Sequence, residues 1–230
     1  MNYILPFSAV VIGFLLAVFF KPKENKYVKL LLSFSGAYLL GLTVFTLLPE
    51  VYHLHGEHNH NALKHTGIFI LLGILLQIVL EFFSQGAEHG HIHTHSHTQK
   101  SFPIALFISL SIHSLLEGFP LTHSHELVYG IFVHKLPIAF VLSAFFINTG
   151  VSKLKTTGFL FLFGLMTPLG TFLSDYVPFL ANYHTELSAM VIGIFLHIST
   201  MILFESAEGH KFNSFKMMSI LLGFLIAYFT

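Results

Sequence analysis

The 230-residue sequence contains no cysteine. Disulfides and thiolate metal ligands are therefore excluded, so any bound metal must be held by imidazole, carboxylate, amide or backbone oxygen groups. Arginine is absent too: all eleven basic residues are lysines, and eleven acidic residues balance them. The formal net charge is therefore zero. Proteins that bind nucleic acids usually carry an excess of basic residues, so the net charge does not indicate a nucleic-acid partner.

Charged residues are also scarce. They make up 10% of the chain, against 54% for hydrophobic residues, and the mean hydropathy is +0.75. A soluble domain carries roughly 25% charged residues, and the apolar residues here fall in long blocks separated by short polar segments. The composition therefore excludes a soluble globule and predicts a single membrane domain over residues 1–230, surrounded by a lipid bilayer.

Eight apolar blocks approach the ~20 residues that a helix needs to cross ~30 Å of hydrocarbon. The blocks do not show the short alternating pattern of a membrane β-barrel, and backbone groups in lipid must be paired internally. We therefore expect an all-α fold, a polytopic membrane bundle of eight transmembrane helices. The blocks occupy residues 3–20, 28–50, 66–84, 101–121, 129–149, 157–176, 187–206 and 214–230.

The distribution of lysine predicts the orientation of these helices. With an outside N-terminus, the outer loops hold one lysine, Lys64, and the cytoplasmic side holds nine. Because lysine concentrates in cytoplasmic loops, both termini are predicted to lie outside. The short loops favour the cytoplasmic membrane of a bacterium. The nine cytoplasmic lysines are Lys21, Lys23, Lys26, Lys29, Lys100, Lys153, Lys155, Lys211 and Lys216.

Two polar tracts between the blocks are rich in histidine. They are the predicted outer loop, residues 52–65, and the predicted cytoplasmic loop, residues 85–100. Closely spaced neutral imidazoles bind borderline divalent ions such as zinc; the alternative is that the tracts are simply hydrophilic, disordered loops. The candidate loop ligands are His53, His55, His58, His60 and His65 outside, and His89, His91, His93, His95 and His97 inside.

Ionisable residues also lie within the predicted spans, where each costs ~2.5–3.5 kcal/mol near the bilayer centre and so needs a reason. The fourth block contains His113, Ser114 and Glu117. Positions four apart share one helix face, so His113 and Glu117 can present nitrogen and oxygen to one ion. His134, in the fifth block, can complete the site from a facing helix. The alternative is a hydrogen-bonded pair that holds two helices together.

Three further polar residues are weaker candidates for the metal pathway. His197 stands alone on an apolar block, where a packing role is the better interpretation. Glu50 follows Pro49 at the outer end of the second block, and Glu205 lies near the inner end of the seventh. Either glutamate can equally be a solvated carboxylate at a helix end.

Four short motifs follow one another along the chain: LPE at 48–50, HSLLEG at 113–118, HKLPIAF at 134–140 and TPLG at 167–170. The second and third resemble the span-4 and span-5 signatures of the ZIP (zinc/iron-regulated transporter-like) family of metal transporters. The other two are similar to the end of span 2 and to a stretch common in span 6 of that family. The eight spans, outside termini and histidine-rich inner loop fit as well, so the resemblance covers the whole chain.

The resemblance implies a transport site between the fourth and fifth spans, with His113, Glu117 and His134 as metal ligands. Two positions depart from the family pattern. Many members carry a glutamate four residues after the span-5 histidine, which supports a second metal, whereas this chain has Ile138. Some members carry a histidine four residues before the span-2 glutamate, where this chain has Thr46. A single bound ion is therefore expected.

These observations together predict a carrier, not an enzyme, for a divalent metal ion such as zinc that moves toward the cytoplasm. Two imidazoles and one carboxylate hold an ion less tightly than a closed four-ligand structural site does, which suits release on the far side. Two alternatives stay open: an intramembrane zinc hydrolase, although no His-Glu-x-x-His motif occurs, and a metal sensor that does not conduct. The sequence leaves the metal's identity and the oligomeric state open, a homodimer included.

Overall fold

The computed structural model describes residues 1–20, 26–53, 60–84, 104–122, 124–149, 151–205 and 214–230. Within these ranges the chain is helical and contains no β-strand, so the predicted all-α class is confirmed. The elements are α1 (Ile4–Phe20), α2 (Lys26–Leu42), the π-helix η1 (Thr43–Leu47), α3 (Leu48–His53), α4 (His60–Ser84), α5 (Ile104–Leu116), the 3-10 helix η3 (Phe119–Thr122), α6 (His125–Asn148), α7 (Lys153–Tyr176), α8 (Pro178–Asn182), α9 (His184–Glu205) and α10 (Ser214–Phe229).

Within the described ranges, six helical segments are long and apolar enough to cross a membrane. Two further apolar helices are shorter, α1 and α10. Each of the eight apolar blocks falls on one helix or on one run of consecutive helices, with ends that differ by a few residues. The six long segments are Tyr27–His53, Asn61–Ser84, Ile104–Thr122, His125–Asn148, Lys153–Tyr176 and His184–Phe204.

The predicted outer loop of residues 52–65 is shorter than expected, because helices enter it from both sides. Helix α3 continues to His53, and α4 begins at His60, so the largely polar residues 60–65 form the first turns of α4. A helix that leaves the apolar layer keeps its own hydrogen bonds, and polar side chains there reach water without ending it. His53 and His65 are exposed on these helix ends, and the intervening residues 54–59 lie outside the described part of the chain.

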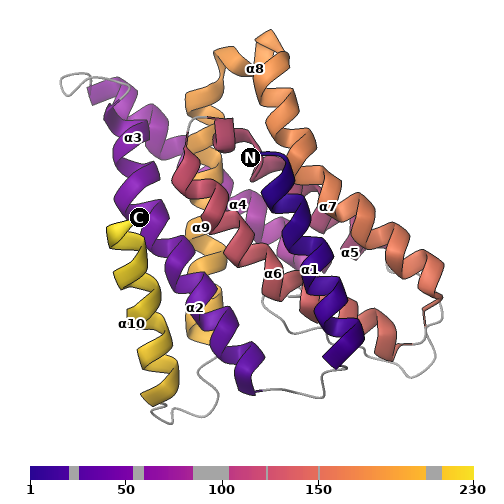
Figure 1. The fold of residues 1–230 in the computed structure, drawn as a ribbon. Helices are drawn as coiled ribbons and strands as arrows, with labels where there is room; N and C mark the ends of the chain where they lie inside the picture. Colours follow the sequence, from indigo (N-terminus) through magenta and orange to yellow (C-terminus); the bar gives the residue numbers. More distant parts are fainter. Residues whose placement is uncertain (21–25, 54–59, 85–103, 123, 150, 206–213) are drawn as a thin grey trace.

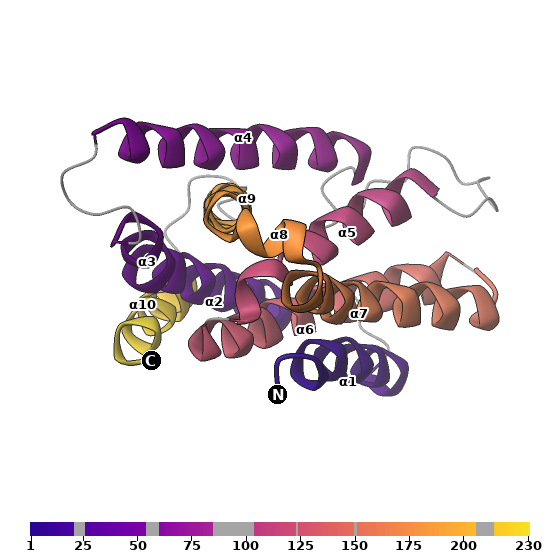
Figure 2. The same cartoon turned by 90° about the horizontal axis from the view of Figure 1, so that it is seen from above.

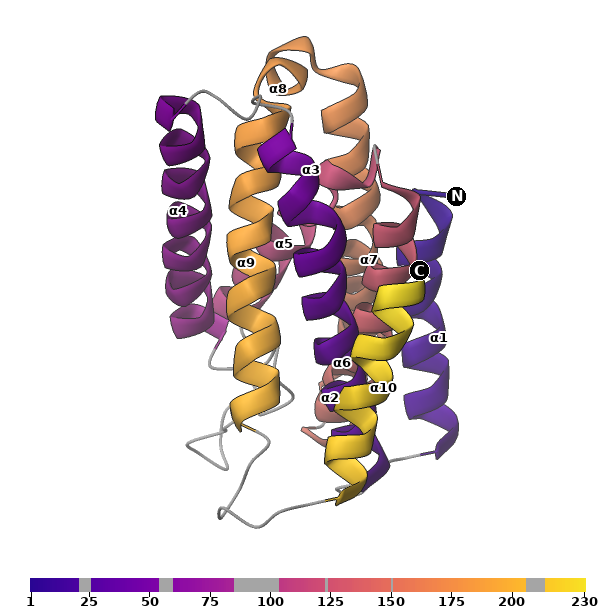
Figure 3. The ribbon, with the colours of Figure 1, turned by 90° about the vertical axis from the view of Figure 1, so that its left-hand side faces the viewer.

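The helices run side by side in layers (Figure 1). Viewed from above, α4 lies at one edge, α9 and α5 lie next to it, and α2, α6 and α7 follow (Figure 2). Helices α10 and α1 form the opposite edge, where α10 packs on α2 and α1 packs on α6 and α7. The view from the side shows α10 alongside α2 and α4 alongside α9 (Figure 3). Helices α5, α6 and α7 therefore meet inside the bundle.

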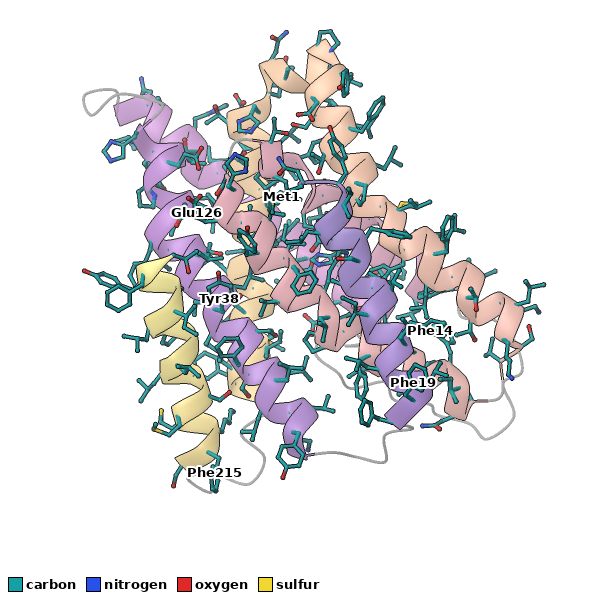
Figure 4. The ribbon with its side chains drawn as sticks, viewed as in Figure 1. Met1, Phe14, Phe19, Tyr38, Glu126 and Phe215 are labelled. Carbon is teal, nitrogen blue, oxygen red and sulfur yellow. The ribbon has the colours of Figure 1, made fainter. Side chains whose placement is uncertain are left out.

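The exterior of the bundle is apolar. Phe19 of α1 and Phe215 of α10 point outward (Figure 4), with 77% and 65% of their surface exposed. Helix α4 has only 22% of its most apolar stretch buried, and its exposed face carries Leu71, Leu75 and Phe82. Large exposed apolar surfaces are unfavourable in water and match hydrocarbon. The fold thus agrees with a membrane-spanning protein.

The segment Tyr27–His53 is interrupted by the π-helix η1, which ends two residues before Pro49. Proline has no backbone N–H and its ring clashes with the carbonyl four residues earlier, here that of Phe45. Widening the preceding turn relieves that clash, and the N–H of Leu48 donates to the oxygen of Thr43, five residues back. This widened turn leads directly into Glu50, which lies partly buried in the first turn of α3.

Helices α4 and α9 contact each other backbone to backbone. A Cβ atom added at Gly73 would lie 2.0 Å from the oxygen of Met190, and one added at Gly193 would lie 2.0 Å from the oxygen of Ile70. Small residues at helix crossings allow this approach, which supplies the dispersion contacts that hold membrane helices together. Glycine at these positions is therefore a requirement of packing.

We expect Gly73→Ala to destabilise the protein by about 1–3 kcal/mol, because the added methyl group has to displace backbone atoms. Gly67→Ala is the matched control on the same helix, since a Cβ there meets no atom within 4 Å and alanine is the better helix former. The comparison is made by thermal unfolding in detergent. Equal midpoints for the two variants would contradict the close crossing.

Candidate metal centre

Helix α5 ends at Leu116, inside the apolar part of the fourth span, and Glu117 lies in the turn that follows. The N–H of Glu117 still donates to the oxygen of His113 at 3.1 Å, so the helical spacing between these two side chains is kept. The N–H of Gly118 instead donates to Leu115 at 3.2 Å, which tightens the last turn. A helix end leaves carbonyl oxygens without helical partners, and in lipid these need other donors.

Two threonines of α7 supply those donors. The hydroxyl of Thr167 lies 2.9 Å from the oxygen of Ser114, and the hydroxyl of Thr171 donates to the oxygen of Gly118 at 3.0 Å. Both threonines are fully buried. The break in α5 is therefore held by side chains from a neighbouring helix.

The contact is close because glycines face each other across the two elements. A Cβ added at Gly118 would lie 2.3 Å from the oxygen of Thr167, and one added at Gly170 would lie 1.9 Å from the oxygen of Leu115. Any larger residue would push α7 away from the end of α5. The glycine pair thus sets the distance at which Thr167 reaches the Glu117 carboxylate.

One carboxylate oxygen of Glu117 is surrounded by donors. Its Oε1 lies 2.5 Å from Lys135 Nζ on α6 and 2.7 Å from the Thr167 hydroxyl. The glutamate is fully buried and the lysine is 1% exposed. Since the Thr167 hydroxyl has a single proton, it donates either to this oxygen or to the Ser114 carbonyl at any moment.

The Lys135 ammonium has three neighbours that suit a cation. Besides Glu117, it donates to the Ser114 hydroxyl, and it lies 4.3 Å from the centre of the Phe163 ring. Aromatic faces attract cations through the ring quadrupole. The buried ammonium is thus paired with one carboxylate and two weaker acceptors, which offsets much of the cost of removing it from water.

The second carboxylate oxygen faces the histidines. Glu117 Oε2 lies 3.6 Å from His113 Nε2, and it has no hydrogen-bond partner among the residues the structure describes. His134 of α6 is fully buried, and its ring centre lies 6.5 Å from that of His113, with the two planes at 76°. His113 therefore lies beside Glu117 and faces His134 of α6. That the three side chains bind one ion stays a prediction.

The spacing of the first two donors suits a divalent ion. With metal–ligand distances of ~2.1 Å in a tetrahedral site, two donors on one zinc lie ~3.4 Å apart, close to the 3.6 Å between Glu117 Oε2 and His113 Nε2. The rings of two imidazoles on one zinc have centres ~5–6 Å apart, so His113 and His134 must approach by about 1 Å.

The described side chains accordingly include no group of three or more histidine, aspartate or glutamate residues already placed to hold a metal ion. The structure supplies a pair of donors at the end of α5, His113 and Glu117, and one further imidazole nearby, that of His134. Closing the site requires a small relative movement of α5 and α6.

The remaining candidates lie elsewhere. Ser114 does not face the histidines: its hydroxyl accepts from Lys135 and lies 3.1 Å from that of Thr167. His197 Nε2 of α9 lies 2.6 Å from Glu81 Oε2 of α4, so this histidine joins two helices, in agreement with the packing interpretation.

Glu50 lies on α3, and Glu205 is the last residue of α9, with its side chain outside the described part of the structure. The candidate loop ligands at 54–59 and 85–103 also lie outside it, and for His60 only the backbone is described.

Two residues that complete the cluster were not predicted as part of it. Lys135 is visible in the sequence as a lysine within an apolar block, and such a lysine requires an acidic partner; Glu117 is the glutamate that meets it. Thr167 lies within the TPLG motif, but a threonine in an apolar helix usually bonds to its own backbone. Only its place opposite the broken end of α5 gives it this role.

A comparison of the chain with known proteins found no matching family model and no significantly similar curated protein. The likeness to a metal transporter family therefore rests on the short motifs described above.

We expect Thr167→Val to destabilise the protein by about 1–3 kcal/mol, because Glu117 Oε1 and the Ser114 carbonyl lose a shared buried donor. The control is Thr43→Val, another fully buried threonine, at the start of η1, whose hydroxyl donates to the Leu39 oxygen one turn earlier at 2.8 Å. Thermal unfolding in detergent measures both variants. A Thr167→Val protein as stable as the control would show that the hydroxyl contributes nothing to the centre.

Proposed function

We propose that the chain is a ZIP-like carrier that moves a divalent metal ion, zinc above all, across the membrane toward the cytoplasm. The observation that carries the proposal is the buried Glu117 Oε2, which has no hydrogen-bond partner among the described residues and lies 3.6 Å from His113 Nε2. A buried carboxylate oxygen without a donor costs free energy. A cation bound between it and the two imidazoles supplies what the oxygen lacks.

The burial of the cluster supports a functional role over a purely structural one. His113, Glu117, His134 and Lys135 are all at least 97% buried within apolar helices. A hydrophobic pair packs two helices at lower cost than buried ionisable groups do. Retaining four such side chains at one contact is typical of an ion pathway.

In the proposed topology, α1 and α10 also cross the bilayer and both chain ends lie outside. Helix α1 has 17 residues and α10 has 16, which corresponds to ~24–26 Å at 1.5 Å per residue. Both run along helices that are long enough to span. The excess of lysine in the proposed cytoplasmic loops supports this orientation.

In the proposed mechanism, an ion from the outside loses part of its water shell to His113, Glu117 and His134. Release requires that the site open toward the other side without strong retention of the ion. At the backbone contact between Gly118 and Gly170, small residues let α7 shift along the end of α5 once the hydroxyl hydrogen bonds of Thr167 and Thr171 exchange partners. The histidines at 89–97 of the inner tract then receive the ion.

We expect His113→Ala and Glu117→Gln each to lower the initial rate of zinc uptake into proteoliposomes at least tenfold, because each removes one of three ligands. Ser143→Ala is the control, since this buried serine of α6 only donates to Ala139 in its own helix. Unchanged saturable uptake by either folded ligand variant would remove that residue from the mechanism. Zinc binding by the wild type without any flux would instead identify a sensor.

The absence of cysteine allows a direct test of the proposed topology. We expect a membrane-impermeant maleimide added outside intact cells to label Lys64→Cys and not Lys153→Cys, because the two positions lie on opposite sides of the bilayer. Permeabilised cells serve as the control and should give labelling of both. Labelling of Lys153→Cys in intact cells would reverse the assigned orientation.

A further inference from the structure

The Glu117 carboxylate separates two environments. Its Oε1 faces Lys135, Thr167 and Ser114, while its Oε2 faces His113. A bridging carboxylate with different cation positions at its two oxygens is the usual core of a two-metal site. Here a side-chain ammonium already stands at one of the two positions.

The oxygen atoms around Lys135 Nζ are those that a hard cation would use. The Glu117 carboxylate is 2.5 Å away, and the Ser114 hydroxyl also accepts a hydrogen bond from the ammonium. The Thr167 hydroxyl lies 2.7 Å from the same carboxylate oxygen. Two side chains from the end of α5, Glu117 and Ser114, thus contact the ammonium of α6, the Phe163 ring of α7 lies on a further side, and Thr167 of α7 holds the carboxylate.

One turn after Lys135 on α6 lies Ile138, an apolar residue that cannot act as a ligand. Ile138 is 3% exposed and packs in an apolar cluster with Val10, Leu110 and Leu142. Among the described residues, Glu117 is the carboxylate that contacts Lys135, so an ion beside Lys135 would share that carboxylate and would meet the ammonium at close range. Two like charges in a water-poor interior repel strongly.

We propose that the Lys135 ammonium permanently fills the second cation position of the centre, so that the centre takes a single divalent ion on the Oε2 side of Glu117. This inference rests on the proposed function and specifies its stoichiometry. The fixed positive charge also weakens binding of that ion, which favours release over retention.

The test counts the ions that depend on Glu117. The number of zinc ions bound per purified chain is measured for each protein and for the same protein with Glu117→Gln. Subtracting the second number from the first removes the zinc that the loop histidines bind. We expect a difference of one ion for the wild type and two for Lys135→Glu, since the introduced carboxylate, Glu117 Oε1 and the hydroxyls of Ser114 and Thr167 then form an oxygen site. Lys155→Glu, at an exposed lysine of α7, is the charge control and should stay at one.

A second variant keeps the proposal open to contradiction if Lys135→Glu does not fold. Lys135→Met keeps an unbranched side chain, one atom shorter, and removes the charge. We expect it to bind one Glu117-dependent ion at least tenfold more tightly than the wild type, because the repulsion is gone. An unchanged or weaker affinity would overturn the proposal.

The outcomes separate this inference from the proposed function. If the wild type shows neither Glu117-dependent zinc binding nor zinc uptake, both the carrier function and the role of Lys135 are contradicted. A transporting wild type with a difference of two ions, or a folded Lys135→Glu chain with a difference of one, would overturn the role of Lys135 and leave the carrier in place.

Discussion

The structure of the centre depends on the buried ion pair between Glu117 and Lys135. Removing two charges from water is costly, and their attraction offsets that cost only when further hydrogen bonds satisfy the remaining groups. The hydroxyls of Ser114 and Thr167 and the Phe163 ring supply such contacts. Because these partners come from several helices, the pair ties together α6, α7 and the end of α5. Breaking it would leave an uncompensated charge inside the apolar bundle.

The early end of α5 is what allows this arrangement. In a continuous helix the carbonyl oxygens at this point would accept from backbone N–H groups of the same helix. The turn at Glu117 and Gly118 instead exposes carbonyl oxygens to the threonines of α7, and the glycine contact lets the two backbones approach. Local structure and site are therefore coupled. The same hydroxyls that complete the helix end also hold the carboxylate in one orientation, with Oε1 toward the ammonium and Oε2 toward His113.

Some features of the centre follow from the sequence because they depend on spacing within one element. His113 and Glu117 are four residues apart, and the hydrogen bond between their backbones keeps them on one face although the helix ends there. The packing role of His197 stays a prediction, and the structure adds its partner, Glu81 of the neighbouring helix α4. The choice of Glu117 as the partner of Lys135 was not predictable, since it depends on how far α6 is rotated and how deep each residue lies.

The all-helical class, the apolar blocks and the set of ionisable residues within them can be predicted from the sequence, because hydropathy and helical periodicity are properties of the chain read in order. Which of those residues contact one another depends on how the helices pack. The tertiary structure placed Lys135 on the Glu117 oxygen, directed Ser114 to the ammonium instead of the histidines, and set His197 against α4. The physical reason is that contacts between helices depend on rotation, depth and close approach at glycines, none of which a one-dimensional pattern specifies.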